Sequence, residues 1–122
     1  MSPDTAEFEP FRCEVDPHRE SVFVRPVGEL DLATAPIVDA QLCELVDAGF
    51  TSVVLDLRKL RFLDSTGLRL LLVWEAKSRA DGVELRVLPG PPAVQRIFAV
   101  AGLTRLVTGP LSAVDQLSLI HI

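Results

Sequence analysis

Asp64-Ser65-Thr66-Gly67-Leu68 is the stretch of sequence that decides the fold of this chain. It follows a β-branched apolar run, Ser52 to Leu57, which is typical of a strand buried in a covered sheet. It leads into Leu68 to Trp74, which is apolar over helical length, so we expect Ser65 at a helix N-terminus. Unpaired N–H groups and the helix dipole favour an anion there, so a phosphate on Ser65 can be accommodated without disrupting the fold. The alternative is that Asp64 or Ser65 only caps the helix.

The segment before this junction predicts a β-hairpin. Apolar residues alternate with polar ones from Phe11 to Val15, Asp16-Pro17 turns the chain, and Ser21 to Val27 returns. Because proline has no N–H to donate, we expect Pro26 at a strand end or in an edge strand.

The remaining elements alternate between helix and strand. A helix is predicted from Thr34, its N-cap, to Gly49, and its buried stripe is expected to contain Ile37, Leu42, Leu45 and Val46. After the strand at 52–57 and a helix from Ser65 to about Arg79, we expect a strand at 83–88 and a helix at 92–101, stopped by Gly102. Alternation of this kind implies right-handed parallel crossovers. The predicted class is therefore α/β: a single domain with a mixed β-sheet, an antiparallel N-terminal hairpin, and helices packed on the sheet.

The helix that begins at Ser65 is apolar nearly all round in its first two turns. We expect Phe62, Leu68 and Leu72 to be core residues that flank the serine turn on its buried side. The second face, Leu70, Val73 and Trp74, is either covered by neighbouring elements or left as an exposed patch that docks a partner.

One rim of the sheet is expected to form a binding surface. Loops after the carboxyl ends of strands gather at one edge, which places Gly28 to Asp31 near Asp64 to Gly67. Gly28 and Gly67 either keep the backbone approachable or serve only as turn residues. The carboxylates of Glu29, Asp31, Asp56 and Asp64 are expected near this rim. We interpret them as loop acids, with no metal, because no histidine or dense ligand motif accompanies them.

Composition argues against several functional classes. Of the 122 residues, 48% are hydrophobic and 24% charged, which suits one small domain. The net charge of −5 and the lack of a long Lys/Arg cluster argue against nucleic-acid binding. Cys13 and Cys43 lack metal-ligand spacing and are expected to be reduced thiols, with a disulfide unneeded. The longest apolar run, Leu70 to Trp74, is too short for a membrane span, and no signal peptide is evident, so we expect a cytoplasmic protein with no membrane partner.

An enzymatic function is not expected. His18 is the one histidine outside the terminal segment, and it lies in the predicted hairpin turn, so Ser65 has no evident base. The Gly-x-Ser-x-Gly elbow is absent, and the prolines of 88–92 remove N–H groups that a phosphate-binding loop needs. No cofactor is therefore predicted.

Several stretches together carry a family resemblance: the serine motif at 64–68, Val54-Leu55-Asp56-Leu57 before it, Gly28-Glu29-Leu30-Asp31, Gly82-Val83-Glu84-Leu85, and the helix and its stop at 92–103. Over about residues 11 to 116 the sequence resembles the STAS domain family, and within it the bacterial anti-sigma factor antagonists. The resemblance implies that the unphosphorylated form binds an anti-sigma factor serine/threonine kinase and frees a sigma factor. The kinase then uses ATP to phosphorylate Ser65, which releases the antagonist, and a phosphatase resets Ser65.

The resemblance also implies a partner-binding surface, made of Gly28, Glu29, Asp31, Asp64, Ser65, Thr66, Gly67 and Leu68. Arg69 departs from the family, whose members often carry glycine at that position, and this leaves the choice of kinase open. Thr66 is the rival phosphate acceptor. A different function is a STAS scaffold subunit of a signalling assembly or lipid-transport complex, in which Ser65 is structural and never modified.

Both ends of the chain are expected to lie outside the domain. Residues 1–10 are polar, contain proline and show no periodicity, so we expect a mobile lead-in. Residues 117–122 read as the translation of CTG TCT CTT ATA CAC ATC, the start of a transposon adapter used in sequencing libraries. We expect this tail, including His121, to be adapter-derived and a native C-terminal helix from near Leu111 to be truncated; the alternative is an ordinary apolar tail.

Overall fold

The computed structural model describes residues 10–108. The expected lead-in, apart from Pro10, and the segment from 109 onward, including the expected C-terminal helix and tail, lie outside the described residues. The limits of the domain therefore stay a prediction.

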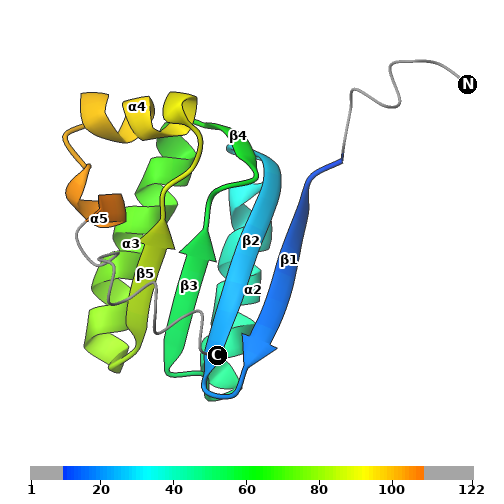
Figure 1. Cartoon of the computed structure of the whole chain (residues 1–122). Helices are drawn as coiled ribbons and strands as arrows, with labels where there is room; N and C mark the ends of the chain where they lie inside the picture. Colours follow the sequence, from blue (N-terminus) through cyan, green and yellow to red (C-terminus); the bar gives the residue numbers. More distant parts are fainter. Residues whose placement is uncertain (1–9, 109–122) are drawn as a thin grey trace, which may run out of the picture.

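A five-stranded mixed sheet forms the centre of the molecule, with the order β1-β2-β3-β5 and β4 paired to β2 (Figure 1). The strands β1 (Arg12–His18) and β2 (Ser21–Leu30) make the predicted antiparallel hairpin. Parallel pairing then joins β2 to β3 (Ser52–Asp56) and β3 to β5 (Glu84–Leu88). The α/β class and the mixed sheet are confirmed.

Pro26 does not lie at a strand end or in an edge strand, and that expectation was wrong. It sits within β2, opposite Cys13 of β1. On its other side, β2 pairs with β3 up to Val24, and with the short parallel strand β4 (Leu60–Leu63) from Gly28 onward. On this side of β2, Pro26 lies between the segment paired with β3 and the segment paired with β4. No backbone acceptor there depends on the N–H that proline lacks. The strand β4 itself was not predicted.

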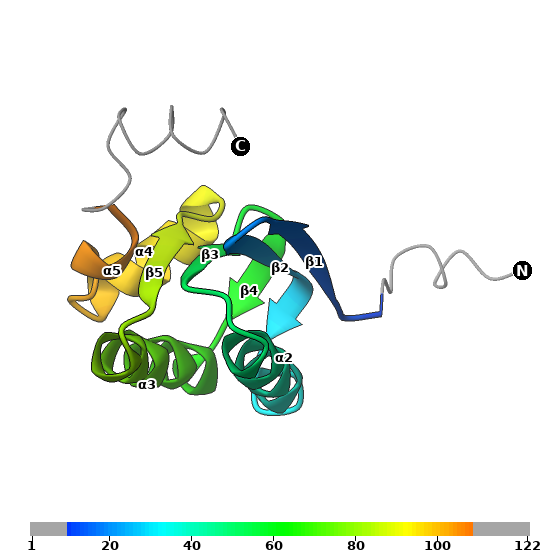
Figure 2. The same cartoon turned by 90° about the horizontal axis from the view of Figure 1, so that it is seen from below.

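Helices α2 (Ala35–Asp47) and α3 (Ser65–Asp81) lie together on one face of the sheet (Figure 2). Thr34 is the N-cap residue of α2 and Gly82 ends α3 in a left-handed conformation with φ of 72°, a geometry that glycine adopts without strain. Helix α4 (Pro92–Val100) contacts β4 beyond the carboxyl end of β5, and the short α5 (Arg105–Thr108) contacts β5 (Figure 1).

The buried faces of the two long helices differ from the prediction. In α3 the buried residues are Gly67, Leu70, Leu71, Trp74 and Ser78. Leu72 is 36% exposed and Phe62 is 44% exposed, so their assignment to the core was wrong, while Leu68 is half-buried. Gly67 decides the rotation of the helix, since a Cβ there would lie 3.0 Å from the Leu30 carbonyl oxygen.

The corresponding error in α2 concerns Ile37, which is 50% exposed. The buried stripe runs through Ala35, Val38, Leu42 and Leu45, so Leu42 and Leu45 are buried as expected and Val46 is half-buried. Trp74 then ties α3 to α2, because its indole Nε1 donates a hydrogen bond to Asp39 Oδ1 at 2.8 Å. The core thus lies between the sheet and these two helices, and it fixes the position of the α3 N-terminus.

Candidate functional site

The N-terminus of α3 is capped by Asp64. Its backbone is extended, and its Oδ1 accepts hydrogen bonds from the N–H groups of Thr66 at 2.9 Å and Gly67 at 3.1 Å. Two of the unpaired N–H groups at the start of the helix are satisfied in this way. Asp64 is therefore the residue that caps α3, and Ser65 is not.

Ser65 is the first residue of α3 and is exposed. Within residues 10–108 no hydrogen bond involves its hydroxyl group, so the oxygen is accessible and has no structural task in capping. The neighbouring Thr66 is half-buried and faces the side on which α2 lies. Of the two hydroxyl groups, that of Ser65 is the more accessible to another protein.

The end of β2 lies directly beside this serine turn. The backbone N–H of Asp64 donates to the carbonyl oxygen of Leu30 at 3.1 Å, and β4 pairs Leu63 with Leu30 and Phe62 with Glu29. Gly67 packs against Leu30 from the helix side. The structure therefore brings the segments 28–31 and 64–68 together at one rim of the sheet.

Within the first of these segments the residues differ in exposure. Glu29 is exposed, Asp31 is half-buried, and Gly28 is buried with φ of 116°, a value that favours glycine. Asp31 serves the start of α2, because its Oδ1 accepts hydrogen bonds from the N–H groups of Ala33 and Thr34. Gly28 and Gly67 thus shape the backbone of the rim, and Glu29 is the side chain most open to a partner.

The four carboxylates expected at the rim are not arranged as one group. Asp64 binds helix N–H groups, Asp31 binds the turn before α2, and Glu29 is exposed. Asp56 is fully buried and accepts hydrogen bonds from Arg25 and Arg58. Within residues 10–108, no three His, Cys, Asp or Glu side chains are placed to hold a metal ion together.

Comparison with known proteins identifies the family. The sequence model described as "Mlab, STAS domain" matches residues 13–108. The chain is 33% identical over 96 residues to the anti-sigma F factor antagonist of Paenibacillus polymyxa, covering 78% of this chain and 82% of the relative. The chain belongs to the STAS domain family.

Two solved structures show what this STAS domain is similar to. The unphosphorylated form of the anti-sigma factor antagonist SpoIIAA is 27% identical, with a TM-score of 0.67 over 81% of this chain and 86% of the other. The phosphorylated form of SpoIIAA, the Bacillus cell fate determinant, is 25% identical, with a TM-score of 0.62 over 81% and 89% of the two chains.

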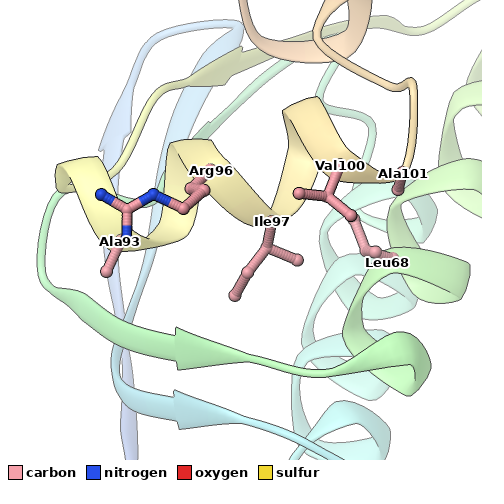
Figure 3. Close-up of a pocket in the computed structure, with 6 residues that line it drawn as sticks. All are labelled: Leu68, Ala93, Arg96, Ile97, Val100 and Ala101. Atoms are coloured by element: carbon pink, nitrogen blue, oxygen red, sulfur yellow. The ribbon is translucent and has the colours of Figure 1, made fainter.

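Two apolar grooves lie beside the first two turns of α3 in this STAS domain. Sequence reasoning missed the first and foresaw only Leu70 and Val73 of the second. The first, of about 450 Å³, lies between α3 and α4, where Leu68 faces Ile97 and Val100 (Figure 3). The second, of about 270 Å³, lies between α2 and α3 and is lined by Leu32, Thr66, Arg69 and Val73, among others. The other contributing residues include single apolar side chains such as Leu32 and Val100, which are 75% and 84% exposed and carry no sequence pattern that marks them.

The expected alternatives for the second face of α3 are both partly met. Leu70 and Trp74 are buried at 8% and 2% exposure, whereas Val73 is 51% exposed. Neighbouring elements therefore cover Leu70 and Trp74 almost completely, and the exposed Val73, together with Leu70, lines the groove between α2 and α3.

The remaining reactive side chains of this STAS domain lie away from Ser65. His18 ends β1 and pairs with Asp16 at 3.2 Å, and its strand position is opposite Ser21, at the other end of β2 from Leu30. Cys13 and Cys43 are free thiols, and burial, with a smaller effect of Glu14, raises the pKa of Cys13 to about 11.

No helix in the described part of the chain is both long and apolar enough to cross a membrane.

Proposed function

We propose that this STAS domain is an anti-sigma factor antagonist whose binding is switched at Ser65. The unphosphorylated form binds an anti-sigma factor serine/threonine kinase in the cytoplasm and frees a sigma factor. Phosphorylation of Ser65 releases the antagonist, and a phosphatase resets it. The single observation that carries the proposal is the exposed, unbonded Ser65 hydroxyl at the start of α3, on a rim flanked by two apolar grooves. The curated relatives named as antagonists, and the SpoIIAA structures in both phosphorylation states, support it.

The local electrostatics favour a switch that acts on binding more than on folding. A phosphoserine adds about −1.5 to −2 charges at neutral pH. In the free domain the helix dipole stabilises such a charge by about 0.3 to 1 kcal/mol. Asp64 already occupies the N–H groups of Thr66 and Gly67, and its carboxylate repels the phosphate. These two effects oppose each other, so we expect the fold to tolerate the phosphate with little change in stability.

The complex with a partner is expected to tolerate the phosphate on Ser65 less well than the free domain does. Its surface would cover Ser65 together with the apolar grooves, which removes water from the phosphate and places it against Asp64. A cost of several kcal/mol is typical of like charges brought together at an interface, and each ~1.4 kcal/mol weakens binding tenfold. We therefore expect phosphorylation to lower the affinity by at least about tenfold.

The experiment uses the full chain with the kinase-like protein encoded nearest its gene. Mass spectrometry after incubation with ATP is expected to find phosphate on Ser65. Calorimetry is expected to show that Ser65→Ala binds like the wild type and that Ser65→Asp binds at least about tenfold more weakly. Thr66→Val is the matched control and should still be phosphorylated. Phosphate on Thr66 alone would refute the site, and equal affinities of the wild type and Ser65→Asp would refute the mechanism.

A second candidate function is a STAS scaffold subunit of a signalling assembly or a lipid-transport complex. The observation behind it is that the matching family model is described by its STAS domain and not as an antagonist. In that function Ser65 stays unmodified. Neighbouring genes for a kinase-like ATPase and a sigma factor support the first proposal, whereas transporter genes support the second.

A further inference from the structure

A cleft of about 390 Å³ lies where the turn between β3 and β4 meets the starts of β1 and α4. Its lining includes four cationic side chains from two distant segments: Arg12 of β1, and Arg58, Lys59 and Arg61 of the turn and β4. We call it the basic cleft. Such a concentration of positive charge contrasts with the net charge of −5 for the whole chain.

Two carboxylates of the described range 10–108 pair with cations of the basic cleft. Glu14 pairs with Arg12, Lys59 and the adjacent Arg25, and Asp56 pairs with Arg58 and Arg25. The side chains of Arg58 and Lys59 are 63% and 53% exposed despite these ion pairs. Arg61 is exposed and makes no ion pair with any residue in the described range 10–108. The positive charges of Arg58, Lys59 and Arg61 are therefore accessible to a partner.

The lining of the basic cleft also has an apolar part. Pro91, the N-cap residue of α4, is half-buried and open to a partner, whereas Val27 and Leu60 are only 4% and 0% exposed. An inorganic phosphate would gain nothing from apolar side chains, and the negative net charge of the chain disfavours nucleic acid. A polypeptide that carries carboxylates beside an apolar side chain matches both the cations and the apolar part of the basic cleft.

We propose that the basic cleft docks an acidic segment of a protein partner, with carboxylates on Lys59 and Arg61 and an apolar side chain toward Pro91. The proposal goes beyond the switch at Ser65 and does not depend on phosphorylation. It extends the interaction surface from the serine turn along β4 to the start of β1.

The test is an NMR titration of the ¹⁵N-labelled full chain in low salt. The probe is the peptide acetyl-Glu-Leu-Glu-Glu-Leu-Glu-amide, which is expected to shift the amide signals of Gly28, Lys59 and Arg61. Replacing each Glu of the peptide by Gln is expected to abolish the shifts, and added salt should weaken them. Since exposed ion pairs are individually weak, we expect the double variant Lys59→Glu/Arg61→Glu to reduce affinity by about fivefold or more.

Arg79→Glu, an equal charge reversal at an exposed site near the end of α3, is the control and should leave the affinity unchanged. Far-UV circular dichroism checks each fold, and Arg61→Gln replaces the double variant if that variant unfolds. Shifts that are absent, that occur elsewhere, or that persist in the charge variants would each overturn the proposal. Pyrophosphate shifting the same amides as strongly as the peptide would also overturn it, in favour of a small-anion site.

Discussion

Asp56→Asn removes a negative charge from a fully buried position with almost no change in side-chain size. The Asp56 carboxylate accepts hydrogen bonds at 2.9 Å from Arg25 Nε and from Arg58 Nε and Nη2, and at 3.0 Å from the Arg58 backbone N–H. Each carboxylate oxygen accepts two of these bonds. Because an amide has a single oxygen, two donors lose their acceptor whichever way the asparagine is oriented.

The magnitude follows from the same geometry. Burial raises the pKa of Asp56, but the hydrogen bonds from Arg58 and Arg25 outweigh that effect and lower the pKa from 3.8 to about 2. The lowered pKa corresponds to about 2 kcal/mol of stability. Breaking a buried ion pair typically costs about 3–5 kcal/mol. The Arg58 side chain is 63% exposed and can turn to water. We therefore expect Asp56→Asn to lower the free energy of unfolding by about 2 kcal/mol, the smaller of the two figures.

Urea unfolding followed by fluorescence of Trp74, the single tryptophan, measures this loss. A carboxylate whose pKa is lowered by folding stabilises the protein above its unfolded pKa, which is 3.8 for Asp56. The stabilisation is lost as the pH falls through the folded value of about 2. The difference between wild type and Asp56→Asn should therefore be constant from pH 7 to pH 5 and shrink below pH 4.

Asp47→Asn, at an exposed carboxylate near the end of α2, is the control and should change stability by less than ~0.5 kcal/mol. If Asp56→Asn is as mild as this control at pH 7, the arginine pairs do not stabilise the fold. If its effect is undiminished at pH 2, the loss does not come from the charge of Asp56.

Three further predictions concern stability and the helix contacts. Leu71→Ala, at a residue 1% exposed, should cost about 2–5 kcal/mol, whereas Leu72→Ala, 36% exposed, should cost under ~1.5 kcal/mol; equal losses in urea unfolding would contradict the assigned helix face. Gly90→Ala should lower the thermal midpoint, because its Cβ would lie 2.7 Å from the Leu57 carbonyl oxygen, at a cost of about 1–3 kcal/mol; an unchanged midpoint would contradict that close approach. Asp39→Ala should cost about 1–2 kcal/mol and shift the tryptophan emission, because the indole N–H loses its acceptor; unaltered emission would count against this bond.

The backbone plan was predictable where short-range chemistry determines it. The β-branched run before the serine turn, the Asp64 cap and Thr34 before α2 each act over a few residues, and the structure places them as expected. The buried face of α3 was not predictable from periodicity, since its first two turns are apolar nearly all round. The informative signal was the pair of small residues Gly67 and Ser78, which lie on the buried face of the helix.

The rim was predictable, and the basic cleft was not. Parallel strands end at one edge, so the proximity of 28–31 to 64–68 follows from topology. The basic cleft needs the hairpin register, which pairs Arg12 with Val27 and so carries a residue from the start of β1 to the end of β2. A search for neighbouring cations along the sequence finds Arg58, Lys59 and Arg61. It misses Arg12, the fourth cation of the cleft, which is distant in sequence.

Leu30 holds the two segments of the rim together, because its carbonyl oxygen accepts a hydrogen bond from the Asp64 N–H and Gly67 packs against it. Two segments that are distant along the chain are thereby fixed to each other before any partner arrives. Association then requires little ordering of the backbone, so the encounter rate is set by diffusion and charge and not by a slow rearrangement. A change of charge at Ser65 would alter the surface that a partner meets without requiring movement of the backbone beneath it.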